Sequence, residues 1–149
     1  MIEHIFISAA HGAPLTAQHS VQVDAGKGIA GDRNYGKQDE PGQNITLVEA
    51  EELEAFCQLY GRAYEPSVIR RNLVTRGVRL NDLVGKQFQL GELVLRGVEL
   101  CEPCSIVGDL LAGPAISAPQ VVKYWVGRGG LRADVVQGGQ LHIGAVLTL

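Results

Sequence analysis

The sequence predicts a mainly β protein folded as one domain, with many short strands and two or three short helices. Two observations support this prediction. Short apolar runs recur between turns, and the chain has 19 glycines but only one Trp, four Tyr and three Phe. The expected strands do not alternate regularly with helices, which argues against a doubly wound parallel sheet. Short strands joined by glycine turns favour a barrel, or a strongly bent sheet that removes its own edges.

Three strands are expected in the first third of the chain. Residues 1–9 are rich in β-branched and aromatic side chains, residues 20–24 alternate with period two, and residues 44–48 are an apolar run. Between the last two lie a glycine-dense loop at 26–33 and a turn at 39–42.

Residues 49–60 show the clearest helical pattern. Acidic residues crowd the first turn, where the helix dipole favours them. One apolar stripe has the i, i+3, i+4, i+7 spacing and consists of Leu53, Phe56, Cys57 and Tyr60. Gly61 follows as the expected C′ residue and ends the helix.

Further strands are expected in the rest of the chain. They cover residues 69–75, 87–90, 93–100, 131–137, 140–143 and 145–149. The turn Gly91–Glu92 joins the second and third of these strands into a hairpin. Glycine turns join the last three, and the first carries two arginines.

The segments between these strands include two expected helices. Ser105 is a suitable N-cap for a short helix that runs to about Leu111. Residues 120–126 favour a helix over a strand, residues 80–86 favour a turn-rich link, and residues 112–119 favour a loop.

The composition and the N-terminal sequence argue against several classes of protein. The net charge of −3 argues against a nucleic-acid binder. The N-terminus has an acidic residue and no basic region, which argues against a signal peptide. No apolar run approaches the ~18 residues of a membrane-spanning helix. Three cysteines do not make a disulfide framework, so a reducing cytoplasm is the expected location.

The segment from Leu100 to Ser105 is the most informative for chemistry, because it places Cys101 and Cys104 on a bend between an expected strand and an expected helix. A zinc site needs four ligands, and the four histidines have no ligand spacing, so no zinc is expected. A thioredoxin-type redox pair needs a βαβ setting that this chain lacks. The plain alternative for Cys101 is a small buried side chain that ends a strand.

Several further motifs are candidates for binding a ligand or for shaping loops. Residues 26–31 match Gly-x-Gly-x-x-Gly, but no helix opens after them, so a loop that approaches a ligand or simply turns is favoured over a dinucleotide site. Asp32 and Arg33 follow and could orient neighbouring loops through a charge-assisted hydrogen bond. Arg128 and Arg132 flank a glycine turn, which suits an oxyanion or is an exposed turn with solvated arginines. Arg70 and Arg71 would face opposite sides of a strand.

Taken together, a series of short segments resembles the MOSC domain family, named after the C-terminal domain of molybdenum-cofactor sulfurases. The segments are GIAGDR (28–33), QNITL (43–47), RNL (71–73), LNDLVG (80–85), GELVL (91–95), EPC (102–104), GRGG (127–130) and GGQLHIG (138–144). Their joint order covers about residues 20–149 of a single domain spanning 1–149.

The resemblance implies a MOSC-type β-barrel, similar to the barrel domain of pyruvate kinase, and one functional cysteine that matches Cys104. In the family, this cysteine is proposed to carry sulfur as a persulfide or to coordinate the molybdenum of a bound pterin cofactor. Larger family members add a pyridoxal-phosphate sulfurase domain or another N-terminal β-barrel domain. Arg71 stands where an acidic residue usually precedes Asn72, which is a departure from the family pattern.

Several functions follow as hypotheses. The first is a reactive Cys104 that carries sulfur from a donor such as a cysteine desulfurase, or that ligates molybdenum. The residues expected to hold the cofactor are Arg128, Arg132, Arg71, Asn72, Gly31, Asp32 and Arg33. The alternatives are an oxyanion or cofactor carrier without turnover, a reductase of N-hydroxylated compounds, and a domain with only a structural role. In the sulfur-transfer hypothesis Cys101 could resolve the persulfide as a disulfide.

Overall fold

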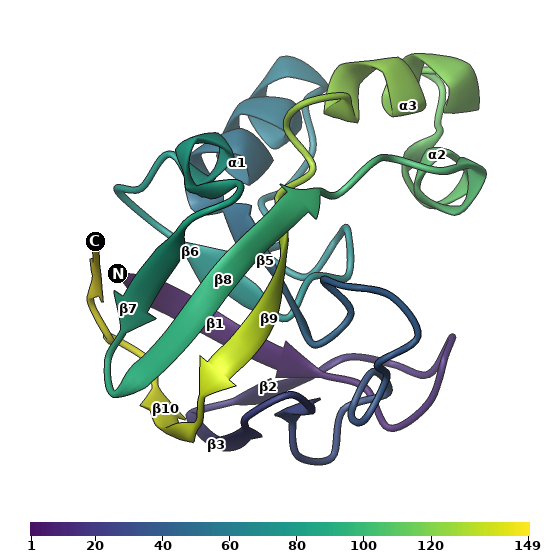
Figure 1. Cartoon of the computed structure of the whole chain (residues 1–149). Helices are drawn as coiled ribbons and strands as arrows, with labels where there is room; N and C mark the ends of the chain where they lie inside the picture. The colour runs from purple at the N-terminus through teal and green to yellow at the C-terminus, as the bar shows by residue number, and fades with distance from the viewer.

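The computed structural model describes residues 1–149, and its secondary structure is mainly β (Figure 1). The strands are β1 (Ile2–Ile7), β2 (Thr16–Gln18), β3 (Ser20–Asp24), β4 (Gly28–Ile29), β5 (Ile45–Glu49), β6 (Leu73–Thr75), β7 (Gln87–Leu90), β8 (Leu93–Leu100), β9 (Leu131–Gln137), β10 (Gly139–His142) and β11 (Leu147–Thr148). The helices are α1 (Ala50–Leu59), α2 (Ser105–Leu111) and α3 (Ala118–Trp125), with a 3-10 turn at Leu80–Leu83. No helix is both long and apolar enough to cross a membrane.

The strands form two sheets. The larger has the order β11-β7-β8-β9-β5-β6-β1-β2 and is antiparallel except for the β5–β6 pair, while the smaller has the order β10-β3-β4. The two edge strands of the larger sheet, β11 and β2, do not pair with each other, so the sheet is bent but open. The expected mainly β, barrel-type architecture is therefore confirmed, with the difference that the barrel is not closed.

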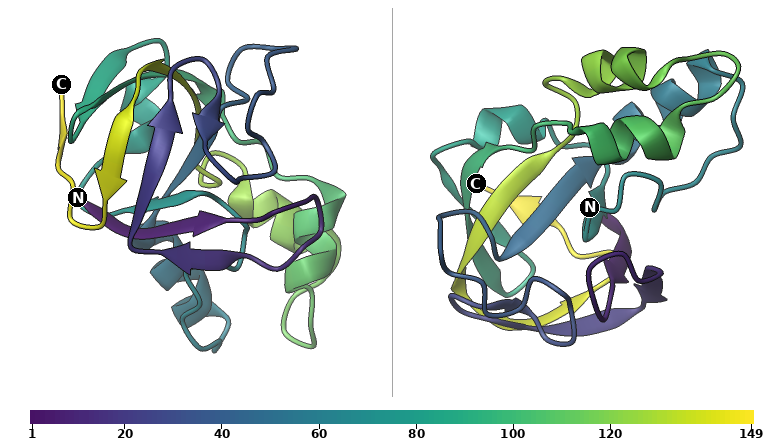
Figure 2. Two further views of the ribbon diagram at one scale, coloured as in Figure 1. Left: turned by 90° about the horizontal axis from the view of Figure 1, so that it is seen from below. Right: turned by 90° about the vertical axis from the view of Figure 1, so that its right-hand side faces the viewer.

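The side chains form two apolar cores on opposite faces of the larger sheet. A cluster of 18 buried residues fills the space between the two sheets, and a second cluster of 13 lies between the larger sheet and the helices. On β5, Leu47 belongs to the first core and Val48 to the second, because successive side chains of a strand point to opposite faces. All three helices gather at one end of the molecule, away from the smaller sheet (Figure 2).

Most expected elements are present close to their expected bounds. The hairpin of β7 and β8 forms as expected, and α1 ends before Gly61, whose φ of 64° fits a C′ glycine. The helix favoured at 120–126 begins earlier, at Ala118, because Ser117 forms a capping box with Gln120.

Some local expectations were wrong, and the expected loop at 26–33 contains the short strand β4. The strand expected over 69–75 begins only at Leu73, because Arg70 adopts φ 62° and is the only non-glycine residue with positive φ. Such a backbone cannot continue a strand. The N-cap of α2 is Cys104 rather than Ser105, which is instead the first helical residue.

Candidate functional site

The three cysteines lie in different environments. Cys57 and Cys101 are buried, at 4% and 3% exposure, whereas Cys104 is exposed. Cys104 has an extended backbone, with φ −124° and ψ 175°, and its carbonyl accepts a hydrogen bond from the Gly108 N–H at 3.1 Å. The start of α2 therefore presents one thiol to the surface, where another molecule can reach it.

Cys101 lies where β8 ends, against the glycine turn that leads into β9. Its N–H donates to the Gly130 carbonyl at 2.8 Å. A Cβ placed at Gly129 would lie 2.8 Å from the Cys101 carbonyl oxygen and 3.4 Å from a terminal nitrogen of Arg71. The contact therefore requires glycine at 129, and it brings the Arg71 guanidinium to the same place as the Cys101 backbone.

Two arginines act on the Cys101 thiol. Its pKa is raised, mainly by burial and also by the negative charge of Glu99, while the cations of Arg71 and Arg132 act in the opposite direction. Arg71 donates from Nε to the Gly129 carbonyl at 2.9 Å, and Arg132 lies on β9 opposite Glu99, with 3.9 Å between Arg132 Nε and a Glu99 oxygen. We call Cys101, Arg71, Arg132 and Gly129 the Cys101 cluster.

Arg71 differs from most of the other arginines nearby, because no carboxylate neutralises it. The ion pairs of the molecule involve Arg33, Arg76, Arg79, Arg128 and Arg132. Arg71 is half-buried, and its one hydrogen bond uses Nε. Its terminal nitrogens are thus free to bind an anion.

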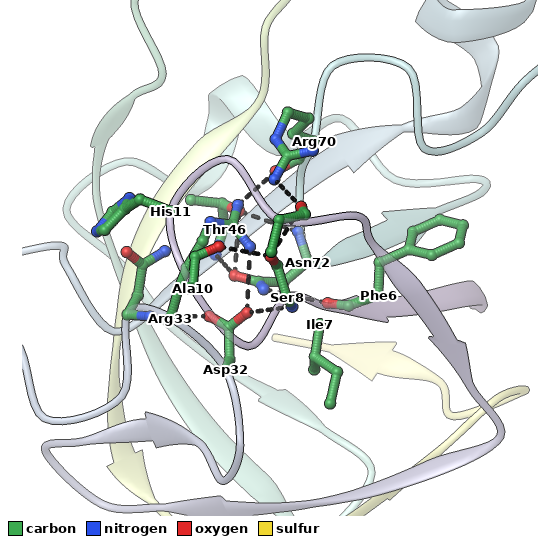
Figure 3. A network of polar contacts seen from close by, with 12 residues as sticks. Phe6, Ile7, Ser8, Ala10, His11, Asp32, Arg33, Thr46, Arg70 and Asn72 are labelled. Carbon is green, nitrogen blue, oxygen red and sulfur yellow. Dashed lines mark hydrogen bonds and ion pairs between the residues drawn. The ribbon is translucent and has the colours of Figure 1, made fainter.

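A second polar network is centred on Asp32 (Figure 3). The buried Asp32 carboxylate accepts the N–H of Ser8 at 3.1 Å and a terminal nitrogen of Arg33 at 3.1 Å. The other terminal nitrogen of Arg33 donates to the Arg70 carbonyl at 2.8 Å, and Arg70 in turn donates to the Ala13 carbonyl at 2.7 Å. This network holds three loops together.

The same network brings three cations close to one another. Burial lowers the pKa of Arg33, the Asp32 carboxylate acts against that shift, and the neighbouring charges of Arg70 and Arg71 add to it. The positive φ of Arg70 separates the two adjacent side chains, so that Arg70 reaches Ala13 and Arg71 reaches Gly129. Of this pair, only Arg71 belongs to the Cys101 cluster.

Asn72 bonds to the backbone of two strands, and Gly31 lies in a turn. The buried Asn72 amide oxygen accepts from the Thr46 N–H at 3.1 Å and from its hydroxyl at 3.2 Å, and the Asn72 amide nitrogen donates to the Phe6 carbonyl at 3.1 Å (Figure 3). Asn72 thereby ties β1 to β5. Gly31 has φ 87° within the turn that leads to Asp32.

The Arg128 side chain contacts the helices rather than the Cys101 cluster. Its guanidinium stacks on Tyr124 at 4.4 Å from the ring centroid and pairs with Glu52 at 3.8 Å. These partners belong to α3 and α1. The structure thus brings Arg71 and Arg132 together around Cys101 and places Arg33 next to Arg71, while Arg128 contacts the helices.

The structure adds residues to the site that the sequence analysis did not select. Cys101 was expected to be a packing residue or a resolving thiol, but it was not among the site candidates, and neither was Arg70. The signals for both were present in the Cys-x-x-Cys spacing and in the triplet Arg70–Arg71–Asn72. No three His, Cys, Asp or Glu side chains come together in an arrangement that would hold a metal ion.

Comparisons with known proteins agree with this fold. A family model described as MOSC domain matches residues 12–148. The YuaD protein of Bacillus subtilis superimposes with a TM-score of 0.83 at 19% identity, covering 98% of this chain and 92% of that chain. YiiM from Geobacillus stearothermophilus superimposes with a TM-score of 0.74 at 20% sequence identity, covering 100% of this chain and 75% of that chain. YiiM from Escherichia coli superimposes with a TM-score of 0.71 at 16% sequence identity, covering 99% of this chain and 68% of that chain. At these identities the solved structures establish the fold alone. No curated protein matches the chain significantly.

Proposed function

The chain belongs to the MOSC domain family, and on this basis we propose that it carries sulfur as a persulfide on Cys104. The observation that carries the proposal is the exposure of Cys104 while Cys57 and Cys101 are buried. A sulfur carrier must meet a donor and an acceptor protein, so its reactive thiol has to lie at the surface. The family is related to molybdenum-cofactor and sulfurase domains, which fits sulfur chemistry.

The loading step conserves atoms and electrons. The Cys104 thiolate attacks the outer sulfur of a persulfide on a donor, such as a cysteine desulfurase, and the donor leaves as a thiolate. Cys104 then carries one additional sulfur. The thiolate is the reacting form.

Mass spectrometry tests the loading step. The reduced protein is treated briefly with a persulfide donor, alkylated and digested with trypsin, which leaves Cys101 and Cys104 on one peptide, 97–123. We expect one added sulfur, assigned to Cys104 by fragmentation, and its loss in Cys104→Ser. Cys57→Ser is the matched control and should load like the wild type. Sulfur found only on Cys57, or unchanged loading in Cys104→Ser, would overturn the proposal.

A second candidate is the binding of a molybdenum–pterin cofactor. The unpaired terminal nitrogens of Arg71 favour it, because the phosphate of such a cofactor needs cationic donors. Cys104 would supply a thiolate ligand, which suits a soft metal, and Arg71 and Arg132 would hold the phosphate. Once bound, the group would supply molybdenum redox chemistry, such as reduction of N-hydroxylated compounds.

Metal and pterin content distinguish this candidate from sulfur carriage. The protein is purified from a host that makes the cofactor, alongside Cys104→Ala and Arg71→Gln. Cofactor binding predicts molybdenum and pterin in stoichiometric amounts in the wild type and reduced amounts in both variants. Bound cofactor without reductase activity would indicate a carrier, and absence of both molybdenum and pterin would exclude this candidate.

A further inference from the structure

Cys101 is a buried thiol that the proposed loading step does not use. It lies three residues before Cys104 and is the closest cysteine to it along the chain. Many buried cysteines pack only against apolar side chains. Cys101 instead lies within the influence of two guanidiniums, from Arg71 and Arg132, which come from different parts of the chain.

The two residues between the cysteines make no hydrogen bond or ion pair of their own. Cys101 is held by its N–H bond to Gly130, and Cys104 is held by its carbonyl at the start of α2. Between them, Glu102 and Pro103 form no backbone hydrogen bond, and Glu102 forms no ion pair. A movement of the Cys104 sulfur toward Cys101 would therefore break no hydrogen bond made by these two residues.

We propose that Cys101 is a resolving thiol, which attacks a persulfide on Cys104 and releases sulfide. This inference rests on the proposed persulfide at Cys104. The Cys101 thiolate attacks Sγ of Cys104, a bond forms between the two cysteine sulfurs, and the bond from Sγ to the outer sulfur breaks. The outer sulfur leaves as hydrosulfide with the electron pair of that bond.

The electron balance closes within the protein and its cargo. The two cysteines are oxidised together to a disulfide, and the outer sulfur is reduced to sulfide by the same two electrons. The proton lost by Cys101 goes to solvent or to the departing sulfide. An external dithiol, acting by thiol–disulfide exchange, returns the protein to its reduced form for another cycle.

The cations of the Cys101 cluster oppose the rise in the pKa of Cys101 that burial causes. An attacking thiol must be present as a thiolate, and burial alone opposes that form. The charges of Arg71 and Arg132 favour it, and the Gly129 carbonyl fixes Arg71 through its Nε. Arg71 and Arg132 are thus positioning residues for Cys101, and Cys101 is the residue that touches the reacting sulfur.

A time course of the donor-treated protein tests the proposal. In the wild type, the sulfur first added to Cys104 should disappear while sulfide accumulates and peptide 97–123 loses two hydrogens as an internal disulfide. Cys101→Ser should keep the persulfide and release at most a tenth of the sulfide. Cys101→Ala serves as a second variant if the serine variant does not fold, and Cys57→Ser should behave like the wild type. Equal release by the wild type and both Cys101 variants would overturn the proposal.

A separate oxidation experiment distinguishes failure of this inference from failure of the proposed function. The reduced protein is treated with a thiol oxidant in place of the persulfide donor. A Cys101–Cys104 disulfide in the wild type supports the pairing even if Cys104 never takes up sulfur, in which case only the proposed function fails. If Cys104 loads with sulfur but neither treatment bridges the two cysteines, the resolving role is excluded and persulfide carriage stands.

Discussion

The pKa of the Cys101 thiol responds to two arginines that the fold brings from distant positions in the sequence. Arg71 lies just before β6, and Arg132 lies on β9. Burial raises the pKa of the Cys101 thiol, and both cations oppose that shift. The balance of burial and charge at this one sulfur therefore sets how much thiolate is present at a given pH.

Replacing Arg71 should move the pH dependence of sulfide release. The thiolate of Cys101 increases as pH rises through its pKa, so the release rate rises with pH and then levels. Arg71→Gln removes a charge that lowers the pKa, and the midpoint should therefore move to higher pH. At neutral pH the release rate should fall about three- to tenfold, since nucleophilicity offsets part of the lost thiolate.

Release rates measured across a pH series provide this comparison. Arg96→Gln is the matched control, because Arg96 is exposed on β8 and has no role in the Cys101 cluster. Its pH profile should coincide with that of the wild type. A profile for Arg71→Gln with an unchanged midpoint would show that Arg71 does not act through the Cys101 thiol.

At the scale of elements, the segment before β6 shows where sequence patterns lose their predictive power. The alternation that predicts β3 and the turn that predicts the β7–β8 hairpin are local, and both elements form within their expected bounds. The conformation of Arg70 is not local, because its carbonyl is held by Arg33 and its side chain by Ala13. No pattern in residues 69–75 reports those partners.

The candidate site was predictable to a similar degree. The Glu-Pro-Cys motif identified Cys104, which is the exposed thiol. Arg128 was selected because it adjoins a glycine turn, but its side chain lies against Tyr124 and Glu52. Arg132 lies near Cys101 because β8 pairs with β9, and Arg71 lies near it through the Gly129 contact. Long-range contacts thus decide which of several plausible residues meet.

The left-handed backbone at Arg70 gives a prediction for this element. A non-glycine residue in this conformation costs roughly 1–2 kcal/mol, and glycine avoids that cost. Arg70→Gly and Arg70→Ala both lose the side-chain hydrogen bond to Ala13, so their difference isolates the backbone. The free energy of unfolding should be about 1 kcal/mol larger for the glycine variant in urea titrations. Equal stabilities would mean that the segment relaxes to negative φ once the arginine side chain is absent.

At the scale of the whole molecule, the larger sheet separates two cores but also joins them. β5 contributes Leu47 to the core between the sheets and Val48 to the core under the helices. β6 contributes Leu73 and Val74 in the same way. Loss of either core would leave the apolar face of these shared strands exposed to water, so neither core is expected to persist without the other.

This shared sheet predicts that the chain unfolds as one cooperative unit. Leu47→Ala and Leu53→Ala remove the same atoms from the two cores, and each should lower the free energy of unfolding by about 2–5 kcal/mol.

The one tryptophan, Trp125, is fully buried in the core under the helices, so its fluorescence follows that side of the molecule. Far-UV circular dichroism follows the secondary structure of the whole chain. In both variants the two signals should shift together, because the strands that carry one core also carry the other. If Leu53→Ala shifted the fluorescence transition but left the main circular-dichroism transition in place, the helices would be a separate unit, and the bend that carries Cys101 and Cys104 would join two parts of different stability.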